Sequence, residues 1–157
     1  MRTLYVLAAV GFLGGTMGLG SDLAAQQNTD PRIGVWQNVN NPGNVMNYDA
    51  IANGGTRLRV DAVNQDSGDV TSYWGYDAFF DGSWHPVTGT NRTGEEEEAT
   101  VNLLSERTTE IRYRDASTGE LDRVLENVVS PNGNTLWVIF RDSDGEVTNI
   151  AIYQRVE

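Results

Sequence analysis

Few residues in this chain have the chemistry of a nucleophile, a general base or a metal ligand. The sequence has one histidine and no cysteine, and every basic side chain is an arginine. A thiolate nucleophile, a Schiff-base lysine and a multi-histidine metal site are therefore excluded. His85 could act as a general base only beside an orienting acid and a nucleophile, which its position before Pro86 does not supply. We interpret His85 as a structural or surface residue, assign no catalytic residue and see no positive sign of an enzyme.

Three acidic arrangements could bind a cation or flank a scissile bond, but each has a simpler interpretation. Residues 142–146 resemble part of a calcium loop but lack its third aspartate and its distal bidentate glutamate, so a hairpin turn is favoured. The glutamate run 95–98 is typical of a solvated loop. Asp77 and Asp81 could flank a sugar bond, yet nothing distinguishes them from ordinary sheet and turn acids. We predict no metal site and no cofactor.

The aromatic residues are the feature that points most towards binding. In a small barrel, five of them could line a cavity for a ligand: Trp74, Tyr76, Phe80, Trp137 and Tyr153. The alternative is that they fill the interior, because a barrel of about eight strands is just wide enough for packed side chains or one small ligand. Trp36 is expected to be a largely buried plug at the closed end. Cavity and packed core both stay open at this point.

These side chains must be positioned by strands. Short apolar segments with period-two alternation recur between turn residues, which is typical of sandwiches and barrels. The chain has about eight or nine such segments, with a long loop holding a helical turn expected at 40–55. The expected strands are 33–38, 56–63, 70–80, 84–87, 99–104, 108–115, 120–129, 135–141 and 147–155. Local turns favour an up-and-down antiparallel barrel over a sandwich, because closure removes exposed sheet edges.

The N-terminal segment has the order of a secretion signal. Arg2 precedes an apolar stretch at 4–19, and the small residues Ala24 and Ala25 follow. An uncleaved anchor is the alternative, but the stretch is short and rich in glycine, whereas a spanning helix needs about 20 apolar residues. We expect cleavage before Gln26 and a periplasmic or extracellular location. The predicted organisation is a signal peptide at 1–25, a flexible leader at 26–32 and an all-β barrel domain at 33–157.

Charge and cysteine content limit the partners. The formal net charge is −11, which repels phosphate backbones and anionic lipid. Nucleic acid is therefore excluded as an expected partner, and so is stable membrane insertion after signal cleavage. Without cysteine, an exported domain has to be stabilised by its core alone, which is feasible at this length.

Several motifs resemble one group of proteins. Gly34-Val35-Trp36 has the G-x-W form of lipocalins and their relatives. Further stretches similar to bacterial exported lipocalin-like proteins lie at 76–89, 129–136, 144–145 and 149–153. The chain from about Gly34 onward therefore resembles these small calycin-type barrels. The resemblance implies a barrel fold but no reaction, and the loop after Gly89 departs from the pattern through its glutamates.

Two functions remain as expectations. The first is an exported small barrel that binds or carries a small apolar or amphipathic ligand. The alternative is a non-catalytic structural or protein-interaction module of the cell envelope with a packed core and a partner that the sequence does not specify. A ligand-sized cavity behind Trp74 and Tyr76 would favour the first, and a filled interior with an exposed apolar patch would favour the second.

Overall fold

The computed structural model describes residues 30–90 and 97–156. The expected signal peptide, its cleavage site before Gln26 and most of the leader lie outside these residues. In the described part the chain is all β, apart from one turn of 3-10 helix, η1 (Ala52–Gly54). No helix in that part is long and apolar enough to cross a membrane.

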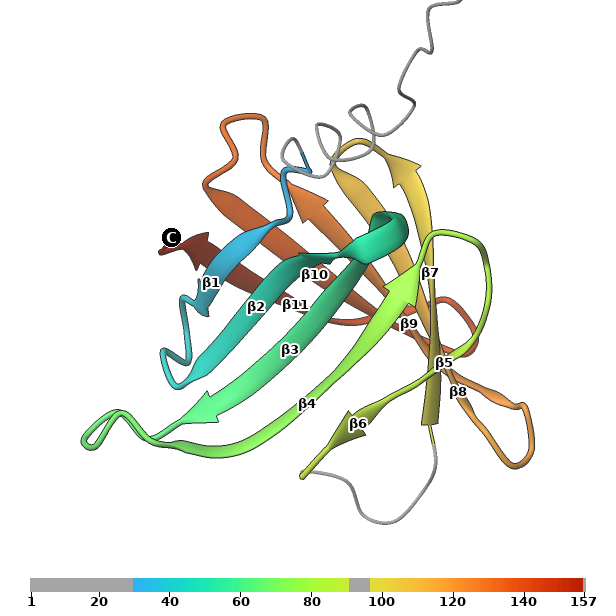
Figure 1. The fold of residues 1–157 in the computed structure, drawn as a ribbon, viewed down its shortest axis with the longest axis horizontal. Helices are drawn as coiled ribbons and strands as arrows, with labels where there is room; N and C mark the ends of the chain where they lie inside the picture. The colour runs from blue at the N-terminus through green and yellow to red at the C-terminus, as the bar shows by residue number, and fades with distance from the viewer. Residues whose placement is uncertain (1–29, 91–96, 157) are drawn as a thin grey trace, which may run out of the picture.

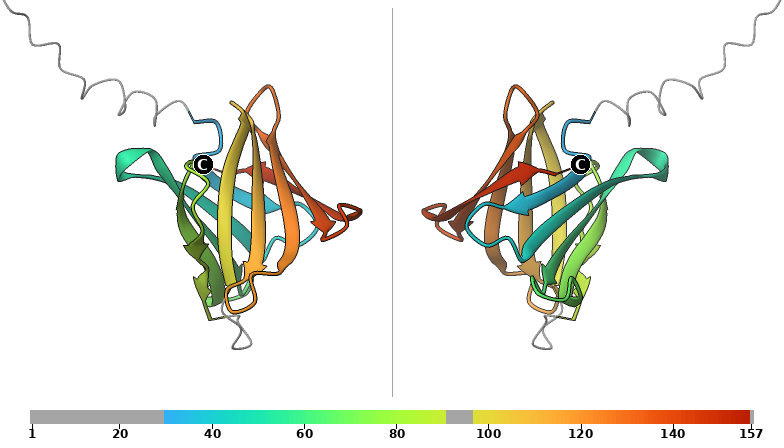
Figure 2. Two further views of the ribbon diagram at one scale, coloured as in Figure 1. Left: turned by 90° about the vertical axis from the view of Figure 1, so that its right-hand side faces the viewer. Right: turned by 90° about the vertical axis from the view of Figure 1, so that its left-hand side faces the viewer.

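Eleven strands form one antiparallel sheet that curls round into a nearly closed barrel (Figures 1 and 2). The strands are β1 (Gly34–Asn38), β2 (Asn44–Ile51), β3 (Gly55–Val63), β4 (Val70–Phe79), β5 (His85–Pro86), β6 (Thr88–Gly89), β7 (Glu97–Ser105), β8 (Thr108–Asp115), β9 (Leu121–Val129), β10 (Thr135–Asp142) and β11 (Val147–Arg155). Their order in the sheet is β5-β7-β8-β9-β10-β11-β1-β2-β3-β4-β6. The predicted all-β, barrel-like meander is therefore confirmed.

The two ends of the domain meet inside the sheet. The last strand, β11, pairs with the first, β1, so that Trp36 lies opposite Arg155. The opposite seam, between β4 and β7, is bridged by one extended segment that changes partner. Its β5 part pairs with β7 and its β6 part with β4. At Gly89 a Cβ atom would lie 2.3 Å from the carbonyl oxygen of Tyr73, so this crossing requires glycine.

The predicted number of eight or nine strands is wrong, and two segments account for the difference. The expected loop 40–55 contains β2, in which buried Met46 and Tyr48 alternate with more exposed polar residues. The expected strand 84–87 is replaced by the two-residue strands β5 and β6. Nine of the strands have five or more residues.

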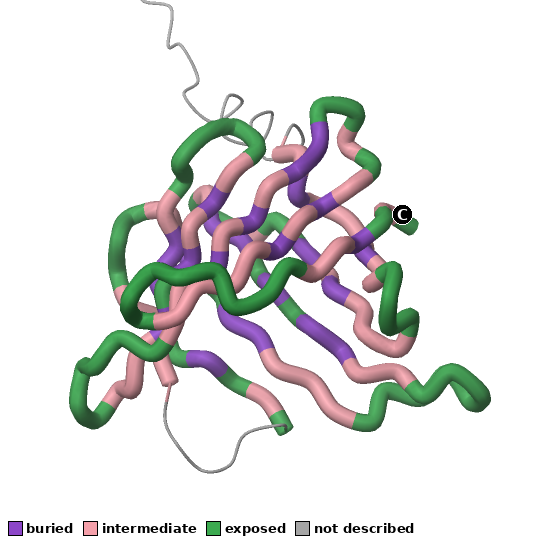
Figure 3. Tube along the Cα trace, turned by 180° about the vertical axis from the view of Figure 1, so that it is seen from behind, coloured by how far each residue is buried: buried purple, intermediate pink, exposed green. Residues whose placement is uncertain are grey.

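The core lies inside the barrel, where buried residues alternate with more exposed ones along most of the long strands (Figure 3). On β3, Leu58 and Val60 are buried between exposed arginines, as the alternation predicts. Trp36, Tyr113 and Leu136 have no exposed surface. The prediction that Trp36 is largely buried is confirmed.

An arginine from the last strand fixes this tryptophan and the chain that precedes it. The guanidinium carbon of Arg155 lies 4.1 Å from the ring centroid of Trp36. Its nitrogens donate to the carbonyl oxygens of Gly133, Ile33 and Pro31 at 2.7, 2.6 and 2.5 Å. Arg155 therefore ties the first and last strands to residues 31–33, which form one wall of the site described next.

Candidate functional site

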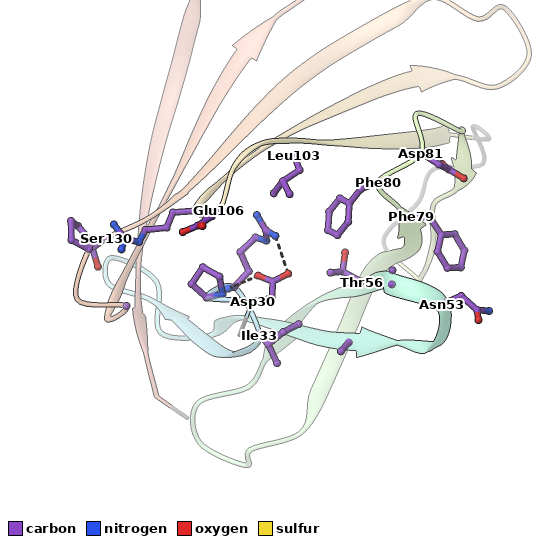
Figure 4. Close-up of a pocket in the computed structure, with 18 of the residues that line it drawn as sticks. Asp30, Ile33, Asn53, Thr56, Phe79, Phe80, Asp81, Leu103, Glu106 and Ser130 are labelled. Atoms are coloured by element: carbon purple, nitrogen blue, oxygen red, sulfur yellow. Dashed lines mark hydrogen bonds and ion pairs between the residues drawn. The ribbon is translucent and has the colours of Figure 1, made fainter. Parts of the chain in front are cut away.

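A pocket of about 920 Å³ lies at the end of the barrel where β1 and β3 begin. We call it the end pocket. Its walls come from residues 30–33, the η1 turn, the end of β4, the β7–β8 hairpin and the turn after β9. The lining residues are Asp30, Pro31, Arg32, Ile33, Ala50, Asn53, Gly54, Gly55, Thr56, Phe79, Phe80, Asp81, Leu103, Glu106, Arg107, Ser130, Pro131, Asn132 and Gly133. Phe80 and Leu103 lie on one side, and Asp30 and Ile33 on the other (Figure 4).

Arg32 is the unusual residue of this pocket, because it is a charged residue with only 3% of its surface exposed. Its Nη2 lies 2.9 Å from Oδ2 of Asp30, and its backbone N–H donates to Oδ1 of the same carboxylate. The guanidinium carbon lies 5.4 Å from the ring centroid of Phe80. Nε and Nη1 are buried without a hydrogen-bond partner among the described residues. Unpaired donors on a buried charge are costly, so such groups usually have a partner.

The end pocket has the composition of a binding site. Phenylalanine, leucine, isoleucine and proline side chains form much of its wall, and Thr56 adds one buried hydroxyl group. Its charged groups are arginines and carboxylates. Such an arrangement can hold an apolar group and orient a polar one.

A second, narrower space of about 220 Å³ lies inside the barrel, and we call it the chamber. Side chains from seven strands line it: Asn44, Met46, Leu58, Val60, Trp74, Ile111, Tyr113, Leu125, Asn127, Val138, Phe140 and Tyr153. The hydroxyl of Tyr153 donates to Oδ1 of Asn44 at 3.1 Å. The chamber is smaller than the roughly 300–1,000 Å³ of common ligand pockets, because most of the interior is filled.

Buried phenols form a polar layer across the barrel. Tyr48, Tyr76 and Tyr113 all lie in the core, and the amide Nδ2 of Asn127 donates to the hydroxyl of Tyr48 at 2.5 Å. Burial raises the pKa of Tyr48 to about 12, and it also raises the pKa values of Tyr76 and Tyr113 above that of an ordinary tyrosine. The hydroxyl of Tyr113 makes no hydrogen bond of regular geometry with the described residues. These tyrosines are therefore neutral at physiological pH.

The different hydrogen bonding of two of these tyrosines predicts different effects of removing their hydroxyl groups. Tyr48→Phe leaves the buried amide of Asn127 without its acceptor and should lower the free energy of unfolding by about 1–3 kcal/mol. Tyr113→Phe removes a hydroxyl group that makes no hydrogen bond of regular geometry, and it should change the free energy of unfolding by less than about 1 kcal/mol. Urea unfolding of both variants measures this contrast. Equal losses would mean that Tyr113 has a partner in solution.

The same phenols predict a loss of stability at alkaline pH. The pKa of Tyr48 is about 12 in the folded chain, against about 10 for an unperturbed tyrosine. As pH rises above the unfolded value, the unfolded chain loses this proton while the folded chain keeps it, so stability falls. We expect Tyr48→Phe to flatten this decline between these two values. Unfolding free energies measured across that range test it.

The five aromatic residues predicted to line one cavity do not lie together. Trp74 and Tyr153 line the chamber, and Phe80 lines the end pocket. Tyr76 lies in the polar layer, with its ring centroid 6.3 Å from that of Tyr113. Trp137 alternates with buried Leu136 and Val138, so its side chain is on the outer face of the barrel.

The sequence did not indicate Arg32 as a site residue, because the polar residues 26–32 are typical of a flexible leader. In the described part of this segment, Asp30 and Arg32 form an ion pair and Arg32 is buried. A basic residue four positions before a core tryptophan was the available signal, since the Nε1 of Trp36 donates to the carbonyl oxygen of Arg32 at 2.8 Å. Its burial depends on Phe80 and on Arg155, neither of which is near it in sequence.

The other candidate residues lie in structural settings. Asp142 accepts backbone hydrogen bonds from residues 144 and 146 in the β10–β11 hairpin turn. Asp77 forms a two-hydrogen-bond ion pair with Arg57, which lowers the pKa of the carboxyl. Nε2 of His85 lies 3.9 Å from Oδ1 of Asp81. Within residues 30–90 and 97–156, no group of three or more potential metal ligands comes together.

Comparisons with protein-family models, with curated proteins and with solved structures find no match to this chain. The site is therefore defined by its own geometry. The chain folds as a nearly closed antiparallel barrel with an end pocket beside a buried arginine and a narrow chamber within.

Proposed function

We propose that this chain is an exported, lipocalin-like barrel that binds a small apolar or amphipathic molecule in the end pocket. One observation carries the proposal: about 920 Å³ of concave space, walled largely by apolar side chains, surrounds the buried and incompletely paired Arg32. A mostly apolar cavity with a few convergent polar groups is how small-molecule sites are usually built. The signal-like order of the N-terminal residues supports export. The G-x-W and later motifs support the resemblance to lipocalin-like barrels.

The end pocket fits this role better than the chamber. The chamber has about 220 Å³ and is bounded by side chains with almost no exposed surface, such as Ile111 and Tyr113. A ligand there would have to displace packed core residues. In the end pocket, Phe80 and Leu103 are only partly buried or exposed and can cover a ligand without repacking the core.

A second candidate function is a protein-interaction module, and two observations favour it: the interior behind Trp74 is mostly filled, and an apolar patch lies on the outer face. Trp137 and Ile139 on β10 lie directly opposite Ile152 and Ile150 on β11. Val128 of β9 extends the row on the other side of Trp137. Ile150 is 52% exposed. The other four residues are half-buried, and a continuous row of apolar side chains on an outer face often marks a contact surface.

Ligand binding in the end pocket predicts a thermal shift. A ligand at 100 times its dissociation constant adds about 2.7 kcal/mol of stability, which should raise Tm by about 10 °C in a domain of this size. The screen uses fatty acids, isoprenoids, haem and small aromatic compounds. An unchanged Tm with every compound of the panel would contradict the proposal and favour the protein-interaction module.

Two neighbouring leucines provide a matched pair of variants for this screen. Leu103 lines the end pocket, whereas Leu104, the next residue of the same strand, is not part of its lining; they are 49% and 57% exposed. Leu103→Asp should abolish the thermal shift, because it places a charge in the apolar wall, and Leu104→Asp should preserve it. Equal effects of the two variants would place the ligand elsewhere.

A further inference from the structure

Two Asn-Gly pairs lie in the wall of the end pocket: Asn53-Gly54 in η1 and Asn132-Gly133 in the turn after β9. In this dipeptide the following backbone nitrogen can attack the asparagine side chain most easily, because glycine has no Cβ atom to obstruct the approach. No other asparagine of the chain precedes a glycine. The two dipeptides are identical, but their structural surroundings differ.

The side chain of Asn132 is held in place by its own turn. Its Oδ1 accepts hydrogen bonds from the hydroxyl of Ser130 at 2.6 Å and from the backbone N–H of Asn134 at 3.1 Å. The nitrogen that would attack it is also engaged, because the N–H of Gly133 donates to the carbonyl oxygen of Ser130 at 2.9 Å. Arg155 holds the same turn through the carbonyl oxygen of Gly133. The side-chain amide of Asn132 can therefore reach the Gly133 nitrogen only after several hydrogen bonds break.

Asn53 lacks these restraints, although both asparagines are exposed. Its side chain makes no hydrogen bond with the described residues and lies at the margin of the pocket (Figure 4). The η1 turn that contains it is three residues long and has no buried residue. The φ angle of Asn53 is 66°, in a region that residues other than glycine seldom adopt. Short, exposed turns of this kind open locally at little cost, so the Asn53 amide and the Gly54 nitrogen can reach each other.

We propose that Asn53 is a site of spontaneous deamidation, whereas Asn132 is protected by its turn. The Gly54 nitrogen attacks the side-chain carbonyl carbon of Asn53 and forms a C–N bond. The bond from that carbon to Nδ2 breaks, and the side-chain nitrogen leaves as ammonia with the proton of the Gly54 N–H. Water then opens the resulting succinimide ring at either carbonyl carbon, which gives aspartate or isoaspartate and restores the Gly54 N–H.

The products change the rim of the end pocket. Aspartate and isoaspartate both carry a carboxylate where the asparagine has a neutral amide, so a negative charge is added beside the wall residues. Isoaspartate also lengthens the backbone between β2 and β3, because the chain then runs through the former side chain. The reaction needs only water and does not depend on the proposed ligand.

Incubation of the folded chain at mildly alkaline pH, followed by peptide mapping with mass spectrometry, measures both sites in one sample. The peptide with Asn53 should convert to aspartate and isoaspartate at least about tenfold faster than the peptide with Asn132, because the hydrogen bonds of Asn132 must break first. Equal rates at the two sites of the folded chain, or no conversion at Asn53, would overturn the proposal.

The same measurement in urea separates the effect of the fold from that of the neighbouring residues in sequence. Unfolding removes the restraints on Asn132, so its rate should rise to a value similar to that of Asn53. If the difference persists in urea, the flanking residues rather than the turn protect Asn132, and the proposal is wrong.

Two substitutions test the restraints in the folded chain. Ser130→Ala removes one donor to Oδ1 of Asn132 and should raise the rate at Asn132 several-fold, with no change at Asn53. Gly54→Ala places a methyl group beside the attacking nitrogen and should slow the reaction at Asn53, with no change at Asn132. A Cβ atom at Gly54 would have no atom within 4 Å, so the second variant tests the proposal even if the first disturbs its turn. An undiminished rate at Asn53 in Gly54→Ala would contradict attack by the Gly54 nitrogen.

Discussion

Replacing Trp36 with alanine should lower the free energy of unfolding by about 3–5 kcal/mol, as large aromatic deletions in cores do. The side chain has no exposed surface and packs against the Arg155 guanidinium. Its Nε1 also donates to the carbonyl oxygen of Arg32. Truncation would leave a cavity, an unpaired carbonyl and an arginine without its aromatic face. Urea unfolding measures the loss.

Trp137 is the matched control, because it is a tryptophan on the outer face of β10. Trp137→Ala should lower the free energy of unfolding by less than half as much as Trp36→Ala does, since Trp137 contacts cross-strand neighbours rather than core residues. The loss of unfolding free energy for Trp36→Phe should lie between those two values, because phenylalanine keeps much of the packing but lacks the N–H donor. A loss below about 1 kcal/mol for Trp36→Ala would show that this residue does not hold the end of the barrel closed.

Replacing Arg155 with methionine should lower the free energy of unfolding by about 2–4 kcal/mol. Each hydrogen bond to a charged group contributes roughly 1.5–3 kcal/mol, and the contributions of the three bonds are not additive. Three backbone carbonyls lose their donor at once: those of Gly133, Ile33 and Pro31. Arg155→Lys should recover little of the loss, because an ammonium group cannot reach three acceptors in the geometry of a guanidinium. Chemical unfolding of both variants tests this.

A double-mutant cycle separates packing from hydrogen bonding in this pair. If Arg155 and Trp36 stabilise each other, the double variant should lose less than the sum of the single losses, since contacting residues commonly show coupling of about 0.5–3 kcal/mol. Additive losses would mean that Arg155 acts only through the carbonyls. Arg155→Met should also weaken the binding of any ligand in the end pocket, because all three of those carbonyls belong to residues of its wall.

The alternation of apolar and polar residues predicted most strands, because a half-buried strand has apolar residues on its buried face and polar residues on the other. Leu58 and Val60 illustrate this on β3, as do Tyr76 and Ala78 on β4. In 40–55 the signal was weaker. Only Met46 and Tyr48 mark the buried face of β2, while proline and glycine at its flanks indicate turns. The exchange of partners between β5 and β6 depends on contacts far apart in sequence and has no local pattern.

The site was less predictable than the fold for a related reason. Alternation shows that Trp74 and Phe80 face inward, but not which interior space each one reaches. The register along the strands and the tilt of the barrel decide that. A buried arginine is harder still to predict, since Arg32 follows polar residues and is covered only when the barrel closes above it. Composition therefore indicates aromatic lining but not the charged group beside it.

The pairing of β11 with β1 has a consequence for the order of folding. Most neighbouring strands are joined by short turns and can pair soon after they are made. One edge of β1 is different, because its partner, β11, lies at the far end of the domain. Long-range pairings of this kind raise contact order and slow folding. During synthesis, a chain that ends before Val147 could form the central hairpins but would leave the edges of β1 and β10 exposed. The completed barrel thus depends on β11, the last of its strands to be made, and a product truncated before β11 would carry open strand edges prone to aggregation.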